Sequence, residues 1–108
     1  MSTVDGTICS SGRQITCDFV INGTNYQYRL RQKYIVPPPF KGEIKLTYGS
    51  LTELTGFQSF HGETSFEPDR THITLNFDDH ELIIEGYIFC NDIREGLFRV
   101  GMGTWDIE

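Results

Sequence analysis

The sequence predicts an all-β protein, a small antiparallel up-and-down β-barrel or strongly bent sheet of about seven to eight strands with at most one short helical turn. Two observations favour this fold class. Aromatic residues make up 13% of the chain and are accompanied by 11 glycines, a balance that favours β structure. Short runs of alternating apolar and polar residues are separated by compact turn sequences, and no helical period is sustained.

The chain length sets the domain organisation. A chain of 108 residues has room for one hydrophobic core. Residues 1–12 are small and polar, so we expect an N-terminal tail or a short edge strand there. Residues 13–108 are expected to form a single barrel-like domain.

The clearest local element is a hairpin centred on Asn22-Gly23. An Asn-Gly pair between two alternating runs favours a type I′ turn, in which both central residues adopt positive φ. This centre pairs residues 15, 17, 19 and 21 with residues 30, 28, 26 and 24. It also places every large apolar side chain of both strands on one face, except Val20. A slip of one residue would reverse this pattern.

A second hairpin is predicted from residues 72–77 and 82–89. A turn centred on Asp79-His80 pairs Phe77 with Leu82 and Leu75 with Ile84. The second strand is also apolar on its other face, so we expect that face to be covered. Its apolar character predicts a possible homodimer.

The remaining elements are predicted from shorter patterns. Ser50 and Glu53 match a capping box, and Gly56 would follow a short helix over residues 51–55. Three further strands are expected over residues 42–48, 63–67 and 97–105, and Pro37-Pro38-Pro39 would end one strand pairing.

Charge restricts the classes of partner. The net charge is −6, and residues 63–108 carry three basic against eleven acidic residues. This distribution argues against nucleic-acid binding, and the one basic strip is Arg29, Arg31 and Lys33. The sequence contains no apolar run long enough to cross a membrane and no signal peptide, which predicts a cytoplasmic protein that does not bind membranes.

Cysteine and histidine spacing predicts neither a metal site nor a cofactor. No pair of cysteines has the spacing of a zinc site, and no glycine-rich phosphate loop is present. We expect Cys9, Cys17 and Cys90 to be reduced thiols, although Cys9 and Cys17 could pair under oxidising conditions.

One group of side chains could transfer protons. The predicted second hairpin places His72 opposite Tyr87, with Glu85 on the diagonal of the same face. Histidine titrates near neutrality and a carboxylate can orient it, so these three are the catalytic candidates. The alternative is a polar outer face without catalysis.

Aromatic side chains on the inner face are the candidates for ligand binding. Buried tyrosine hydroxyls need hydrogen-bond partners, which a ligand at an open barrel mouth could supply. The candidate residues are Tyr26, Tyr28, Tyr34, Tyr48 and Trp105. The alternative is a core filled by these side chains.

These observations predict a small soluble binding module. It would take an apolar or aromatic small molecule inside the barrel, or a protein partner on its surface as an inhibitor or antagonist does. The alternative is a cofactor-free cyclase or isomerase that uses an aromatic-lined barrel pocket to fold its substrate.

Overall fold

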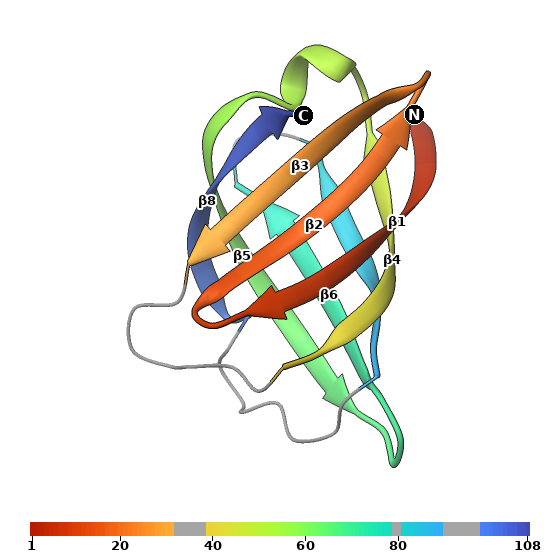
Figure 1. The fold of residues 1–108 in the computed structure, drawn as a ribbon, viewed down its shortest axis with the longest axis vertical. Coiled ribbons are helices and arrows are strands. Elements are labelled where there is room, and N and C mark those ends of the chain that lie inside the picture. The colour runs from red at the N-terminus through yellow and green to blue at the C-terminus, as the bar shows by residue number, and fades with distance from the viewer. Residues whose placement is uncertain (32–38, 79–80, 90–97) are drawn as a thin grey trace.

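The protein is a closed antiparallel β-barrel (Figure 1). The computed structural model describes residues 1–31, 39–78, 81–89 and 98–108. Its elements are β1 (Ser2–Ser11), β2 (Gln14–Ile21), β3 (Thr24–Arg31), β4 (Lys41–Tyr48), the 3-10 turn η1 (Leu51–Glu53), β5 (Gly56–Phe66), β6 (Thr71–Phe77), β7 (Ile83–Ile88) and β8 (Val100–Ile107). The predicted fold class is confirmed. Within the described ranges, no helix has the length and apolar character to cross a membrane.

The order of strands around the barrel differs from the simple up-and-down order. The order is β1-β2-β3-β8-β5-β6-β7-β4, so β4 returns beside β1 and β8 returns beside β5. Each half of the barrel is therefore a Greek key of three hairpin-linked strands and a fourth that closes beside the first. The expectation of an up-and-down order is wrong because alternation predicts the face of each residue and not the neighbours of each strand.

The N-terminal residues form a full barrel strand. β1 pairs with β2 on one side and with β4 on the other, so residues 2–11 are neither a tail nor an edge strand. Alternation is weak here because the inward row contains Gly6, which has no side chain, between Val4 and Ile8. That weak alternation explains why the sequence pattern predicted at most a short edge strand and not a strand paired on both sides.

Both predicted hairpins are present. In β2–β3, Phe19 pairs with Tyr26 and Cys17 with Tyr28, as predicted. Asn22 and Gly23 have φ values of 52° and 79°. In β6–β7, Leu75 pairs with Ile84, while the central residues 79–80 of that turn lie outside the described residues.

The capping box is also confirmed. The Ser50 side chain accepts a hydrogen bond from the Thr52 backbone N–H at 3.3 Å, and Glu53 Oε1 accepts from the Ser50 N–H at 2.8 Å. The turn ends earlier than predicted, because Thr52 and Thr55 are poor helix formers. In contrast, β5 begins at Gly56 and is longer than the strand predicted over 63–67.

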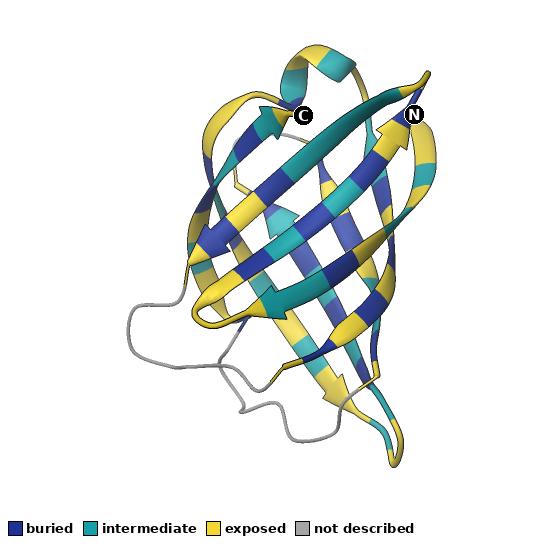
Figure 2. Cartoon of the chain, viewed as in Figure 1, coloured by how far each residue is buried: buried dark blue, intermediate teal, exposed yellow. Residues whose placement is uncertain are grey.

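Aromatic rings fill the centre of the barrel. The rings of Phe19, Tyr28, Phe60, Phe77 and Trp105 contact one another, with centroid separations between 4.9 and 6.3 Å. Figure 2 shows the buried positions alternating along the strands, as a barrel with one inner face requires. An eight-stranded barrel is just wide enough to be filled by its own side chains, and these rings do so.

One buried residue, Gln58, accepts hydrogen bonds from the polar atoms of this cluster through its backbone and side-chain oxygens. The Tyr28 hydroxyl donates to the Gln58 backbone oxygen at 2.8 Å, and Trp105 Nε1 donates to Gln58 Oε1 at 3.3 Å. Gln58 Nε2 in turn donates to the backbone oxygens of Glu53 and Thr55, next to η1. Burial raises the pKa of the Tyr28 hydroxyl, which therefore stays protonated and keeps its role as a donor.

Glycines make room for the rings. A methyl carbon added to Gly101 would lie 2.8 Å from Phe60 Cζ, and one added to Gly103 would lie 2.6 Å from Tyr28 Cζ. Gly6 stands in the same relation to Phe19, at 2.4 Å from its ring. Each ring thus occupies the space that a side chain on the neighbouring strand would need.

We predict that Gly101→Ala destabilises the protein by about 1–3 kcal/mol and that Phe60→Leu largely removes this cost. The three atoms nearest to the added methyl at Gly101 all belong to the Phe60 ring, so a smaller residue at position 60 relieves the clash. Urea unfolding followed by the fluorescence of the single tryptophan measures the two single variants and the double variant.

Gly103→Ala with Tyr28→Leu is the matched control. There the added methyl also lies 2.4 Å from the backbone oxygen of Arg29, which no side-chain truncation moves. The cost of Gly103→Ala should therefore persist in the Tyr28→Leu background. If the effects of Gly101→Ala and Phe60→Leu on the free energy of unfolding are additive, the Phe60 ring does not cause the cost of Gly101→Ala.

Candidate functional site

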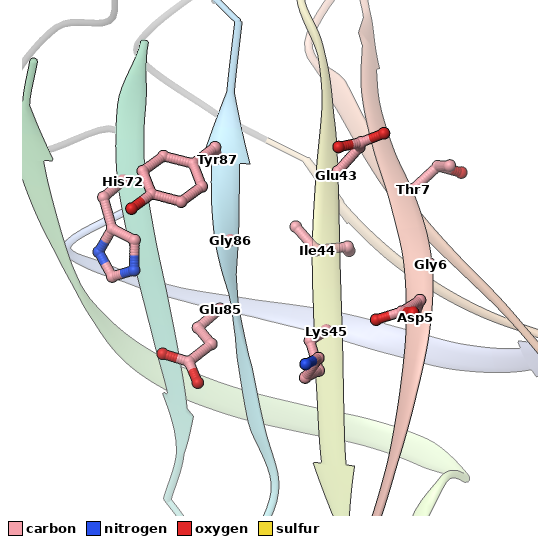
Figure 3. A pocket seen from close by; sticks show the side chains of 10 residues that line it. All are labelled: Asp5, Gly6, Thr7, Glu43, Ile44, Lys45, His72, Glu85, Gly86 and Tyr87. Atoms are coloured by element: carbon pink, nitrogen blue, oxygen red, sulfur yellow. The ribbon is translucent and has the colours of Figure 1, made fainter.

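A groove crosses the outer face of β1, β4, β7 and β6. Its volume is about 610 Å³. Ten residues line it: Asp5, Gly6, Thr7, Glu43, Ile44, Lys45, His72, Glu85, Gly86 and Tyr87 (Figure 3). The groove lies outside the filled interior and gathers ionisable side chains from all four strands.

Strand register arranges the polar side chains in two parallel rows. One row runs from Asp5 through its partner Lys45 to Glu85. The other runs from Thr7 through Glu43 and Tyr87 to His72. Both rows point outward because their residues alternate with inward-facing positions along each strand.

The floor of the groove is backbone. Gly6, Ile44 and Gly86 are partners in one line across the three strands, between the two polar rows. These three positions face inward. The two glycines have no side chain, and the Ile44 side chain is buried, so none of them projects outward. Figure 3 shows Tyr87, Glu43 and Thr7 on one side of this floor and Glu85, Lys45 and Asp5 on the other.

The charge of the groove is negative. Its lining holds the carboxylates of Asp5, Glu43 and Glu85 and one ammonium group, that of Lys45. Among the described residues, Asp5, Glu43 and Glu85 form no ion pair within 4.0 Å, and neither does Lys45. The carboxylates are exposed and available to a positively charged group.

One end of the groove is an aromatic and cationic stack. The rings of His72 and Tyr87 meet edge to face with centroids 5.1 Å apart, which confirms their predicted pairing. The guanidinium carbon of Arg70 lies 3.9 Å from the Tyr87 ring centroid, and Arg70 Nε donates to Glu67 at 3.2 Å. The Tyr87 ring therefore already holds a guanidinium group on one face.

The predicted catalytic residues share this surface without forming a proton relay. His72, Glu85 and Tyr87 all line the groove, as their register predicts. No hydrogen bond joins these side chains in the part of the chain that the structure describes. The sequence pattern did not indicate Asp5, Glu43 and Lys45 as site residues, because β1–β4 and β4–β7 pair across long sequence separations.

The predicted ligand-binding residues do not line one common pocket among the described residues. Tyr28 and Trp105 are buried in the aromatic core, and Tyr48 packs against that core from a partly buried position. Tyr26 lies at the barrel end, where it lines a second hollow together with Trp105. Tyr34 lies outside the described residues.

A polar cluster that the sequence reasoning missed lies on β5 and at the end of β6. His61 Nδ1 is 2.7 Å from Asp78 Oδ1, and the Ser59 hydroxyl donates to Asp78 Oδ2 at 2.8 Å. Ser59 and His61 both lie on β5. Sequence spacing does not reveal this cluster, because Asp78 lies far along the chain from Ser59 and His61. The three residues meet only through the β5–β6 pairing, in which Phe60 pairs with Phe77.

Cysteines and metal ligands add no chemistry to the described surface. Cys17 faces the interior, whereas Cys9 pairs with Thr16 and lies on the opposite face, so these two thiols do not pair in this fold. Both are free, burial raises the pKa of Cys17, and Cys90 lies outside the described residues. Within the described ranges, no three His, Cys, Asp or Glu side chains are grouped as metal ligands.

The outer face of β7 is open in the single chain. We expected this face to be covered, but Phe89 just after β7 is 56% exposed and Ile83 is 37% exposed. Glu85 and Tyr87 of the groove lie between them along the chain. A single chain therefore does not cover this face, and cover by a second chain stays a prediction.

Comparison of the chain with protein-family models, with curated proteins and with solved structures found no match.

We predict that Asp78→Asn destabilises the protein less as the pH falls. Hydrogen bonds from His61 and then from Ser59 lower the pKa of Asp78. A lowered carboxyl pKa stabilises the folded state above the ordinary aspartate range, and this contribution is lost as the pH falls through the folded-state pKa. Urea unfolding between about pH 6 and pH 3 should show the two stability curves converging.

Glu63→Gln on β5, the strand that carries Ser59 and His61, is the control for this comparison. Glu63 is exposed and forms no ion pair with any described residue. Its curve should run parallel to that of the natural chain. A constant difference between Asp78→Asn and the natural chain at all pH values would contradict the assignment.

Proposed function

We propose that the protein is a non-catalytic protein-binding module whose outer groove binds a positively charged segment of a partner. The observation that carries this proposal is the set of three exposed carboxylates around an open groove of about 610 Å³. A lysine or arginine side chain laid across the backbone floor would contact both polar rows. The charge of the groove would also speed the encounter with a basic partner.

The filled interior supports a site on the surface. Tyr28 and Trp105 would have to move aside for a ligand at the barrel centre, and both are held by Gln58. The same packing gives little support to a cyclase or isomerase with its substrate inside the barrel. The groove also lacks a hydrogen-bonded acid–base pair among its described residues.

Barrel closure restricts the mode of recognition. Every strand has a partner on both sides, so no free edge is offered to a partner strand in the paired regions. Recognition then depends on side chains that project from the barrel wall. The Arg70–Tyr87 contact shows that this wall accommodates a guanidinium group beside the groove.

The test is binding of a fluorescein-labelled peptide of alternating arginine and glycine, measured by fluorescence polarisation. The natural chain should bind it saturably, and Glu43→Gln with Glu85→Gln should weaken the affinity by about fivefold or more. Raising the salt concentration should weaken binding as well, because the contacts are exposed ion pairs.

Glu63→Gln with Glu81→Gln is the matched control. It removes the same formal charge from exposed positions outside the groove lining. Its affinity should stay within about twofold of the natural chain. The proposal fails if both double variants weaken binding equally, or if an alternating glutamate and glycine peptide binds as well as the arginine peptide.

Homodimerisation would use the same face. The exposed Ile83 and Phe89 support pairing of two chains across β7, and such a dimer would cover Glu85 and Tyr87. We therefore expect dimer formation and peptide binding to exclude each other. Analytical ultracentrifugation at micromolar concentration should show the arginine peptide shifting the chain towards its monomer mass of 12.4 kDa. A dimer that is unchanged by saturating peptide would contradict this arrangement.

A further inference from the structure

A second hollow of about 640 Å³ opens at the end of the barrel beside η1. It shares no lining residue with the groove. Its lining consists of Tyr26, Leu51, Thr52, Leu54, Thr55, Trp105, Asp106 and Ile107. We infer that this hollow binds an uncharged, mainly apolar small molecule, at a site separate from the protein-binding groove.

The inner apolar row of β3 and β8 is only partly covered at its last pair, Tyr26 and Ile107, beside the hollow. Tyr26 pairs with Ile107 on the face that, one pair further in, presents the buried Tyr28 and Trp105. Ile107 is nevertheless 65% exposed, although it continues an inward-facing row. An apolar ligand over this pair would remove that surface from water and complete the layer.

The opposite wall of the hollow is held in position. It is formed by Leu51 and Leu54 of the η1 segment, and Leu54 is buried. The capping box fixes the start of this segment, and Gln58 Nε2 binds the backbone oxygens of Glu53 and Thr55. A wall fixed before binding lowers the entropic cost of receiving a ligand.

The chemistry of the lining selects an uncharged ligand. Asp106 is the one ionised side chain of the lining, and its carboxylate is bonded to the Arg29 guanidinium. The other lining side chains are apolar, or carry a hydroxyl in the case of Tyr26, Thr52 and Thr55. The Tyr26 hydroxyl makes no hydrogen bond to the residues that the structure describes. A ligand with a flat apolar body and one hydrogen-bonding group would match this lining, and the hollow has the size of small-molecule sites.

The experiment is a titration of the intact chain with N-phenyl-1-naphthylamine, a neutral apolar fluorophore. Trp105 is the single tryptophan and lines the hollow, so a probe bound there should quench its emission by energy transfer. We expect saturable quenching at a stoichiometry of about one. Leu51→Glu and Ile107→Glu should each weaken binding by about tenfold or more, because each replaces an apolar contact with a charge.

The matched control is Phe57→Glu. Phe57 is 79% exposed and does not line the hollow, so its replacement should leave the affinity within about twofold. Ile107→Ser, which adds no charge, should weaken binding without lowering the melting temperature, since Ile107 is largely exposed. The inference is overturned if quenching does not saturate, or if Phe57→Glu weakens binding as much as Ile107→Glu. Neither result depends on the arginine-peptide assay, so the two sites can fail separately.

Discussion

The rest of the structure depends on the way glycines accommodate aromatic rings inside a narrow barrel. Gly6, Gly101 and Gly103 leave the space in which the rings of Phe19, Phe60 and Tyr28 lie. An eight-stranded barrel has little interior volume, and each of these three rings lies where a glycine on one neighbouring strand carries no side chain. The packed rings in turn bury Trp105, and Gln58 satisfies the polar atoms that this burial removes from water. The ring packing and the hydrogen bonds of Gln58 are therefore consequences of one constraint.

Because the interior is filled, the hollows that could bind a partner or ligand lie on the outer face and at one end of the barrel. On the outside, the row of Gly6, Ile44 and Gly86 separates two lines of charged and aromatic side chains and forms a backbone floor between them. At the end beside η1, the inner row finishes with Ile107 largely exposed. The two sites have opposite chemistry, because the outer rows are ionised and the barrel end continues the apolar core.

Several local features could be predicted from residues close together in the chain. Asn22-Gly23 determines the β2–β3 register through its positive φ values, and Ser50 with Glu53 determines where η1 begins. The His72–Tyr87 pair followed from alternation about one turn. The first half of β5 was missed because Leu51, Leu54, Phe57 and Phe60 recur every third residue, which fits neither an ideal strand nor an ideal helix.

Local backbone preference and side-chain parity thus explain which residues face inward in β2, β3, β6 and β7, since both act within a single hairpin. The neighbours of β1, β4 and β8 could be established only in the folded barrel. The pairings β1–β4, β3–β8 and β4–β7 join strands far apart in the chain, and no turn residue specifies their register. Asp5, Glu43 and Glu85 come together only through these pairings, so the charge of the groove is a property of the closed barrel.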